Sequence, residues 1–157
     1  MKKKLLSNNR LVPLLAAVFL LSFVGGAYAG QSGIDGITGK RTFNFIAKAD
    51  HISTVDGGNY LIWGYADNDD REGFADTRAQ YPGPTLIVNQ GETITVNLTN
   101  NLSEPVSMIF PGQTGVTTTP SGTNPGPLTK EVPTGATVQY QFVASQPGTY
   151  MYHSGTD

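Results

Sequence analysis

The chain has 157 residues, of which 38% are hydrophobic and 14% are charged, with a formal net charge of −2 and no cysteine. The lack of cysteine excludes a thiol nucleophile, a zinc–thiolate site and a blue-copper centre of the His/His/Cys kind. It also excludes disulfides, so a folded domain of this chain must be stabilised by packing.

The N-terminal 29 residues have the pattern of a signal peptide. A basic start precedes an apolar run from Leu11 to Val24, and Ala27-Tyr28-Ala29 fits a small-x-small cleavage site. The alternative is a membrane anchor, but this run has 14 residues, whereas a spanning helix needs ~20. We therefore expect an exported protein, periplasmic or extracellular, with no membrane segment after cleavage.

Cleavage after Ala29 leaves a mature chain of 128 residues, which suits one domain with one core. This mature chain carries six basic and twelve acidic residues, a formal charge of −6. An acidic chain without a cluster of Lys and Arg argues against a nucleic-acid partner.

Residues 30–40 are rich in glycine and polar residues and predict a flexible lead-in, whereas 41–157 predict one all-β domain. Apolar and more polar side chains alternate along several short segments, and turns rich in Gly and Pro separate these segments. This pattern is typical of half-buried antiparallel strands in a sandwich or a Greek-key barrel. Thr114 to Pro127 has no apolar pattern and predicts a long loop. The predicted strands lie around residues 43–49, 60–65, 94–98 and 138–142.

Two segments resemble a known family. The run Tyr81–Val88 (YPGPTLIV) leads into Gly91–Leu98 (GETITVNL), and Gly148–Gly155 (GTYMYHSG) follows about fifty residues later. Together these segments resemble the N-terminal, plastocyanin-like cupredoxin domain of multicopper oxidases. The resemblance implies a cupredoxin-like Greek-key β-sandwich or barrel, copper as cofactor, and further cupredoxin domains or a partner chain. It also implies a strand after His153, so we expect a domain that lacks its last strand.

The resemblance also implies where copper ligands would stand. In the family, the later segment ends in a His-x-His pair, and here His153 is followed two residues on by Gly155. The earlier pair, His-x-His-Gly, maps onto Ile109, Pro111 and the closing Gly112. Three of the four ligand positions therefore hold residues that cannot bind a metal. His153 remains as a candidate metal ligand, and one imidazole rarely holds a metal alone. Copper binding by this chain is thus expected to be weak or absent.

Other chemistry finds little support in the sequence. There is no Gly-x-Ser-x-Gly elbow and no His-Glu-x-x-His motif, and we predict no catalytic residue. Met108 and Met151 are soft enough to contact Cu(I), but both lie in apolar contexts that favour core packing.

The resulting hypothesis is an exported cupredoxin-like domain with a degenerate copper site, which is not an oxidase on its own. Two alternatives stay open. One is a metal-free exported β-sandwich with a structural or binding role, and the other is a truncated fragment of a longer multicopper oxidoreductase.

Overall fold

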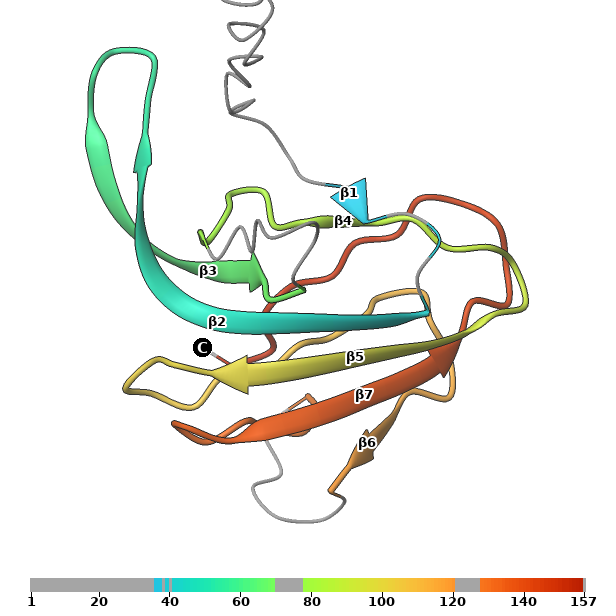
Figure 1. The fold of residues 1–157 in the computed structure, drawn as a ribbon. Coiled ribbons are helices and arrows are strands. Elements are labelled where there is room, and N and C mark those ends of the chain that lie inside the picture. The colour runs from blue at the N-terminus through green and yellow to red at the C-terminus, as the bar shows by residue number, and fades with distance from the viewer. Residues whose placement is uncertain (1–35, 38, 40, 70–77, 121–127, 157) are drawn as a thin grey trace, which may run out of the picture. The chain divides into compact units, whose positions relative to one another are not determined.

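The computed structural model describes residues 36–37, 39, 41–69, 78–120 and 128–156, which all lie in the second of two compact units, Ile34–Asp157. These residues form strands and irregular segments, with no helix among them (Figure 1). The predicted all-β class is therefore confirmed. The predicted signal peptide falls outside the described residues. The strands are β1 Gly36–Ile37, β2 Thr42–Ser53, β3 Asn59–Asp67, β4 Thr85–Leu86, β5 Thr93–Asn100, β6 Thr117–Thr119 and β7 Thr137–Val143.

Five strands form one open sheet in the order β3-β2-β5-β7-β6 (Figure 1). β2 pairs antiparallel with β3 but parallel with β5, and β7 pairs antiparallel with both β5 and β6. The parallel β2–β5 pair requires a crossover, because two parallel neighbours cannot be joined by a tight hairpin. The chain between them supplies that crossover with β3 and β4.

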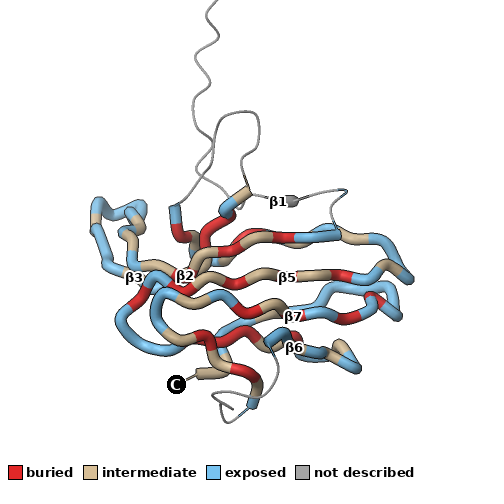
Figure 2. Tube along the Cα trace, turned by 60° about the horizontal axis from the view of Figure 1, so that its bottom comes forward, coloured by how far each residue is buried: buried red, intermediate tan, exposed pale blue. Residues whose placement is uncertain are grey.

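The core lies on one face of this sheet. Side chains alternate between buried and partly exposed along β2, β5 and β7, as Figure 2 shows in red and tan. The register sets Phe43 opposite Val96, which in turn faces Tyr140, so the buried residues form rows across the three strands. A side-chain period of two places every second residue on the same face, and the predicted alternation is confirmed here.

The opposite face of the same strands carries a row of amide side chains. Asn97 donates to Asn44 at 2.8 Å and accepts from Gln139 at 3.1 Å. These three residues are cross-strand partners in the register. Hydrogen-bonded polar pairs on this face add to the stability of the sheet and fix its register.

A second, less regular layer covers the core face. β1 pairs parallel with β4, and two isolated bridges join Val106 to Val132 and Ile109 to His153. Met108, Phe110 and Val132 from this layer belong to the same buried cluster as the sheet residues. The described part of the chain is thus a two-layered β structure with one core.

The structure departs from the predicted elements at two places. β6, Thr117–Thr119, lies inside the segment predicted to be a loop, because its backbone completes the edge of the sheet beside β7. β1 lies inside the predicted lead-in, so the folded unit begins before residue 41. No helix long and apolar enough to traverse a bilayer occurs in the described ranges.

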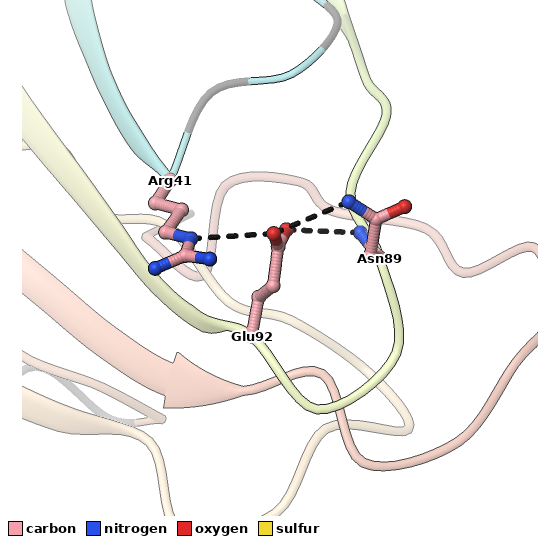
Figure 3. A network of polar contacts seen from close by, with 3 residues as sticks. All are labelled: Arg41, Asn89 and Glu92. Atoms are coloured by element: carbon pink, nitrogen blue, oxygen red, sulfur yellow. Dashed lines mark hydrogen bonds and ion pairs between the residues drawn. The ribbon is translucent and has the colours of Figure 1, made fainter.

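The turn before β5 is built around Glu92. Its carboxylate accepts hydrogen bonds from the backbone N–H of Asn89 at 3.0 Å and from the Asn89 side chain at 3.2 Å, and it pairs with the Nε of Arg41 at 3.2 Å (Figure 3). Gly91 has a φ of 84°, a conformation that glycine adopts without steric cost. The Gly-Glu pair of the sequence motif is therefore one turn, in which Gly91 supplies the conformation and Glu92 the acceptors.

This turn predicts a pH-dependent stability. The bonds from Asn89, followed by the Arg41 pair, hold the pKa of Glu92 below its ordinary value of 4.5. A lowered folded-state pKa means that the stabilisation is present above pH 4.5 and is lost as the pH falls through the folded-state pKa. We expect Glu92→Gln to be less stable than the wild type near neutral pH, and the difference to shrink on acidification.

Urea denaturation at a series of pH values measures this difference. Glu104→Gln is the matched control for the loss of one negative charge, because Glu104 is exposed and lies outside the turn. If the free energies of unfolding of the wild type and Glu92→Gln differed by the same amount at all pH values, the charge of the carboxylate would not contribute to the stability of the turn.

Candidate metal centre

The two segments onto which the resemblance maps the ligand motifs lie side by side. Ile109 and His153 form an antiparallel bridge, in which the Ile109 N–H donates to the His153 carbonyl at 2.9 Å and the His153 N–H donates to the Ile109 carbonyl at 3.2 Å. These residues are 44 positions apart in the sequence. The segment Tyr150–His153 is not a regular strand, and only His153 is paired in this way.

Gly155 faces the side chain of Ile109. A Cβ atom at Gly155 would lie 2.8 Å from the Ile109 Cγ2 atom and 3.2 Å from the Ser107 Oγ atom. Ile109, His153 and Gly155 therefore meet at one place. Pro111 lies two residues beyond Ile109 in an exposed turn. The branched side chain of Ile109 and the hydroxyl of Ser107 therefore leave no room for a side chain at Gly155 without a shift of one of them.

His153 is exposed, and a contact with the next residue orients its ring. Its Nδ1 atom lies 2.7 Å from the Ser154 carbonyl oxygen, which leaves the Nε2 atom for any other bond. No group of three or more His, Cys, Asp or Glu side chains comes together in the described ranges. Copper in proteins is held by several imidazole, thiolate or thioether ligands. The donor set at this place is one imidazole, which does not fit such a copper site.

A buried hydroxyl network fixes the segment after His153. The Oγ atom of Ser107 accepts from the Gly155 N–H at 3.1 Å and from the Thr156 hydroxyl at 2.8 Å. The carbonyl of Ser107 accepts from the Tyr65 hydroxyl at 2.6 Å. Ser107 is fully buried, and these bonds pair its polar atoms. Sequence reasoning missed Ser107 and Tyr65, because their partners lie more than 40 residues away.

Tyr152 connects the two family-like motifs. Its hydroxyl donates to the Pro84 carbonyl at 2.6 Å, and its ring lies 6.0 Å from the rings of Phe45 and Tyr65. A Cβ atom at Gly83 would lie 2.6 Å from the Tyr152 hydroxyl, so a larger residue at this position would displace that hydroxyl. Burial raises the pKa of both Tyr65 and Tyr152, and these phenols therefore stay protonated at neutral pH.

Met108 and Met151 differ in burial. Met108 is fully buried in the core, which confirms the prediction for this residue. Met151 is 66% exposed, so the prediction of core packing is wrong there. Met151 lies in no strand, and the side chain that packs against the core from this run is that of Tyr152.

Residues 66–157 match the sequence profile of a family described as multicopper oxidase. The iron transport multicopper oxidase fetC of Epichloe festucae is 39% identical over 84 residues, and laccase-1 of Cryptococcus neoformans var. grubii is 36% identical over 75 residues. These matches cover 50% and 47% of this chain but only 13% and 12% of the relatives. The chain thus spans about an eighth of the length of the curated relatives it matches.

Solved structures show the same similarity. The multicopper oxidase mgLAC is 28% identical with a TM-score of 0.54, and the match covers 73% of this chain and 32% of that protein. McoA from Aquifex aeolicus has a TM-score of 0.56 at 18% identity, and the match covers 79% of this chain and 24% of that protein. The latter identity supports the fold alone, and the fold is that of a domain within a multicopper oxidase.

Proposed function

The chain belongs to the multicopper oxidase family, and from this premise we propose that it is an exported cupredoxin-like domain with a degenerate copper site, which is not an oxidase on its own. The observation that supports this proposal most is the contact between two positions that the resemblance maps onto ligands. A Cβ at Gly155 would lie 2.8 Å from Ile109 Cγ2, so a histidine side chain at residue 155 would collide with Ile109 unless one of them moved.

The chemistry of the family supports the second part of this proposal. Oxygen reduction by multicopper oxidases needs three coppers held between two domains and a fourth that delivers electrons. This chain offers two histidines in all, His51 and His153. His51 lies on β2 opposite Leu61 of β3, away from the Ile109–His153 bridge. A protein with one imidazole at the mapped place cannot assemble such a cluster from its own residues.

The proposed export rests on residues 1–29. A basic start, a 14-residue apolar run and an Ala-Tyr-Ala sequence fit a cleaved signal peptide. The destination would be the periplasm or the outside of the cell.

A longer oxidase is the second candidate, and the coverage of the relatives favours it. The matched relatives are multicopper oxidases of which this chain covers 13% or less in the two cases above. Within a longer polypeptide this domain would act as one part of a multicopper oxidoreductase, with the copper ligands supplied by other domains. Sequencing the gene beyond the codon for Asp157 tests this candidate, because an open frame that encodes further cupredoxin domains would establish it.

A copper titration tests the proposed degenerate site. We expect the full chain to show no saturable one-to-one uptake of Cu(II) in isothermal calorimetry, and no oxidation of phenols above that of free copper. His153→Ala and His51→Ala are matched variants, because both histidines are exposed. We expect them to change the titration equally little. Tight one-to-one binding that disappears only in His153→Ala would contradict the proposal.

A further inference from the structure

Beyond Ala47, β2 and β3 form a two-stranded arm. β2 pairs with β5 only over Thr42–Ala47, whereas its pairing with β3 continues to the turn that joins them. Figure 1 shows this arm, in turquoise and green, extending away from the other strands. Two-stranded ribbons are only marginally stable by themselves, and further strands stabilise them. The arm is thus the part of the sheet that would gain most from another strand.

The two sides of the arm differ in charge. The β2 side carries Lys48 and Asp50, which form an ion pair at 3.5 Å. On the β3 side, the segment Asn59–Trp63 contains neither a charged residue nor proline, and no other strand of the described ranges pairs with β3. Charged side chains and proline hinder the pairing of an edge strand with another chain. The β3 side of the arm is therefore an edge that can accept a further strand.

Large apolar side chains of β3 are exposed on both faces of the arm. Tyr60 is 55% exposed, Leu61 63% and Trp63 58%. Side chains alternate along a strand, so Leu61 and Trp63 point to one face and Tyr60 points to the other. A strand beside β3 would cover part of all three side chains, and the burial of apolar surface is favourable.

The backbone groups of this edge point outward at alternate residues. Across the arm, the Thr54 N–H donates to the Gly58 carbonyl at 2.9 Å. On the far side of β3, the Tyr65 carbonyl accepts from the Gln80 N–H at 3.2 Å. The direction of the backbone groups alternates along a strand. The odd-numbered residues from 59 to 63 therefore direct their N–H and C=O groups away from β2.

From these observations we propose that the β3 edge of the arm pairs with the same edge of a second copy of the chain, antiparallel and about a two-fold axis at Leu61. The two Leu61 residues would then lie opposite each other, and Asn59 would lie opposite Trp63. All these residues direct their backbone groups outward, so the residues of each pair would exchange both hydrogen bonds. On the other face, Tyr60 would lie opposite Ile62, and such aromatic–aliphatic pairs stabilise a sheet.

The surroundings of the edge fit a second copy. The pairing would end at Trp63, because the next outward carbonyl, that of Tyr65, is bonded to Gln80. The residues of the second copy that come next to this end are Gly57 and Gly58 of its turn, which have no side chains to collide there. Since two identical edges pair, the assembly closes as a dimer. The contact contains no mapped ligand position, so its failure would leave the proposed copper site untouched.

The fluorescence of Trp63 measures this contact, because Trp63 is the only tryptophan of the chain. We expect the emission of the full chain to move to shorter wavelength as its concentration rises from ~1 µM to ~1 mM, a range that suits a small interface. Sedimentation velocity should show the matching change from monomer to dimer. An emission that stays constant over this range would overturn the proposal.

Leu61 and Leu128 provide matched variants of the same residue type. Leu61 is 63% and Leu128 72% exposed, so substitution of either should leave the fold intact. Leu128 lies near β6, at the opposite edge of the sheet. Leu61→Lys would place two like charges opposite each other, and we expect at least ~10-fold weaker dimerisation. We expect no change for Leu128→Lys. Equal dimerisation of the two variants would mean that the copies meet elsewhere, which would overturn the proposal.

A disulfide tests the position of the two-fold axis. The chain has no cysteine, so Leu61→Cys and Leu128→Cys each carry a single thiol. Residues opposite each other in a hydrogen-bonded antiparallel pair have Cα atoms ~5.5 Å apart, which suits a disulfide. In air, we expect Leu61→Cys to form a covalent dimer at least ~10-fold faster than Leu128→Cys. Equal rates would contradict the proposed pairing.

Discussion

Replacing Ile109, Pro111 and Gly155 by histidine is expected to raise the affinity of the chain for Cu(II) at least ~100-fold. The triple variant would place three new imidazoles beside that of His153, which gives four at the positions that the family resemblance assigns to ligands. The bridge between Ile109 and His153 already holds the two segments beside each other. Imidazole is a good ligand for copper, and several ligands from a fixed backbone bind more tightly than one.

The packing around Gly155 explains why Gly155→His must be combined with Ile109→His. Gly155→His alone would bring a Cβ within 2.8 Å of the Ile109 Cγ2 atom, and we expect it to destabilise the fold by about 1–3 kcal/mol. Histidine has no second γ carbon on its Cβ, so Ile109→His removes that contact. Gly155 does not have a positive φ, and its backbone can therefore accept a side chain once the space is free.

Calorimetry and electron paramagnetic resonance measure the expected copper uptake. The control is the same triple variant with His153→Ala, which should bind Cu(II) more weakly. A triple variant that is folded but binds no more copper than the wild type would show that the four positions do not converge. The alignment of the ligand motifs onto Ile109, Pro111 and Gly155 would then be wrong.

Asn100→Ala is expected to lower the free energy of unfolding by about 3 kcal/mol. Asn100 is fully buried at the end of β5. Its side-chain amide donates to the carbonyls of Glu104 and Val132 at 2.8 Å each, and its carbonyl accepts from the Leu102 N–H at 2.8 Å. Alanine would leave three backbone groups without this partner, and unpaired buried polar groups are costly.

Equilibrium denaturation in urea measures this effect. Asn101→Ala is the matched control, because it makes the same chemical change one residue further on at an exposed position. We expect the control to stay within about 0.5 kcal/mol of the wild type. Similar losses for the two variants would mean that water or a backbone shift replaces the bonds of Asn100.

Three contacts hold the segment that carries His153. Tyr152 packs against the core from this segment, and its hydroxyl donates to the Pro84 carbonyl. The segment 146–156 is thus held by Tyr152, by the bridge at His153 and by Ser107 at Gly155.

The sequence by itself determined the strands and the family. Alternation along residues 43–49, 94–98 and 138–142 predicts which side chains enter the core, because successive residues of a strand point to opposite faces. The motifs Tyr81–Val88 and Gly148–Gly155 predict the cupredoxin-like class by their resemblance to the family, and the same resemblance implies that Ile109 and Gly155 stand at ligand positions.

Edge-strand pairing, the exposure of single side chains and long-range contacts were decided only by the tertiary structure. β6 has no apolar pattern, because its pairing with β7 depends on backbone bonds rather than on buried side chains. Met151 is exposed, whereas its neighbour Tyr152 packs against the core from the same segment. The contact between Ile109 and Gly155 and the bonds of Ser107 join residues more than 40 positions apart. Such contacts follow from how the whole core packs, and a period of two along one strand holds no information about them.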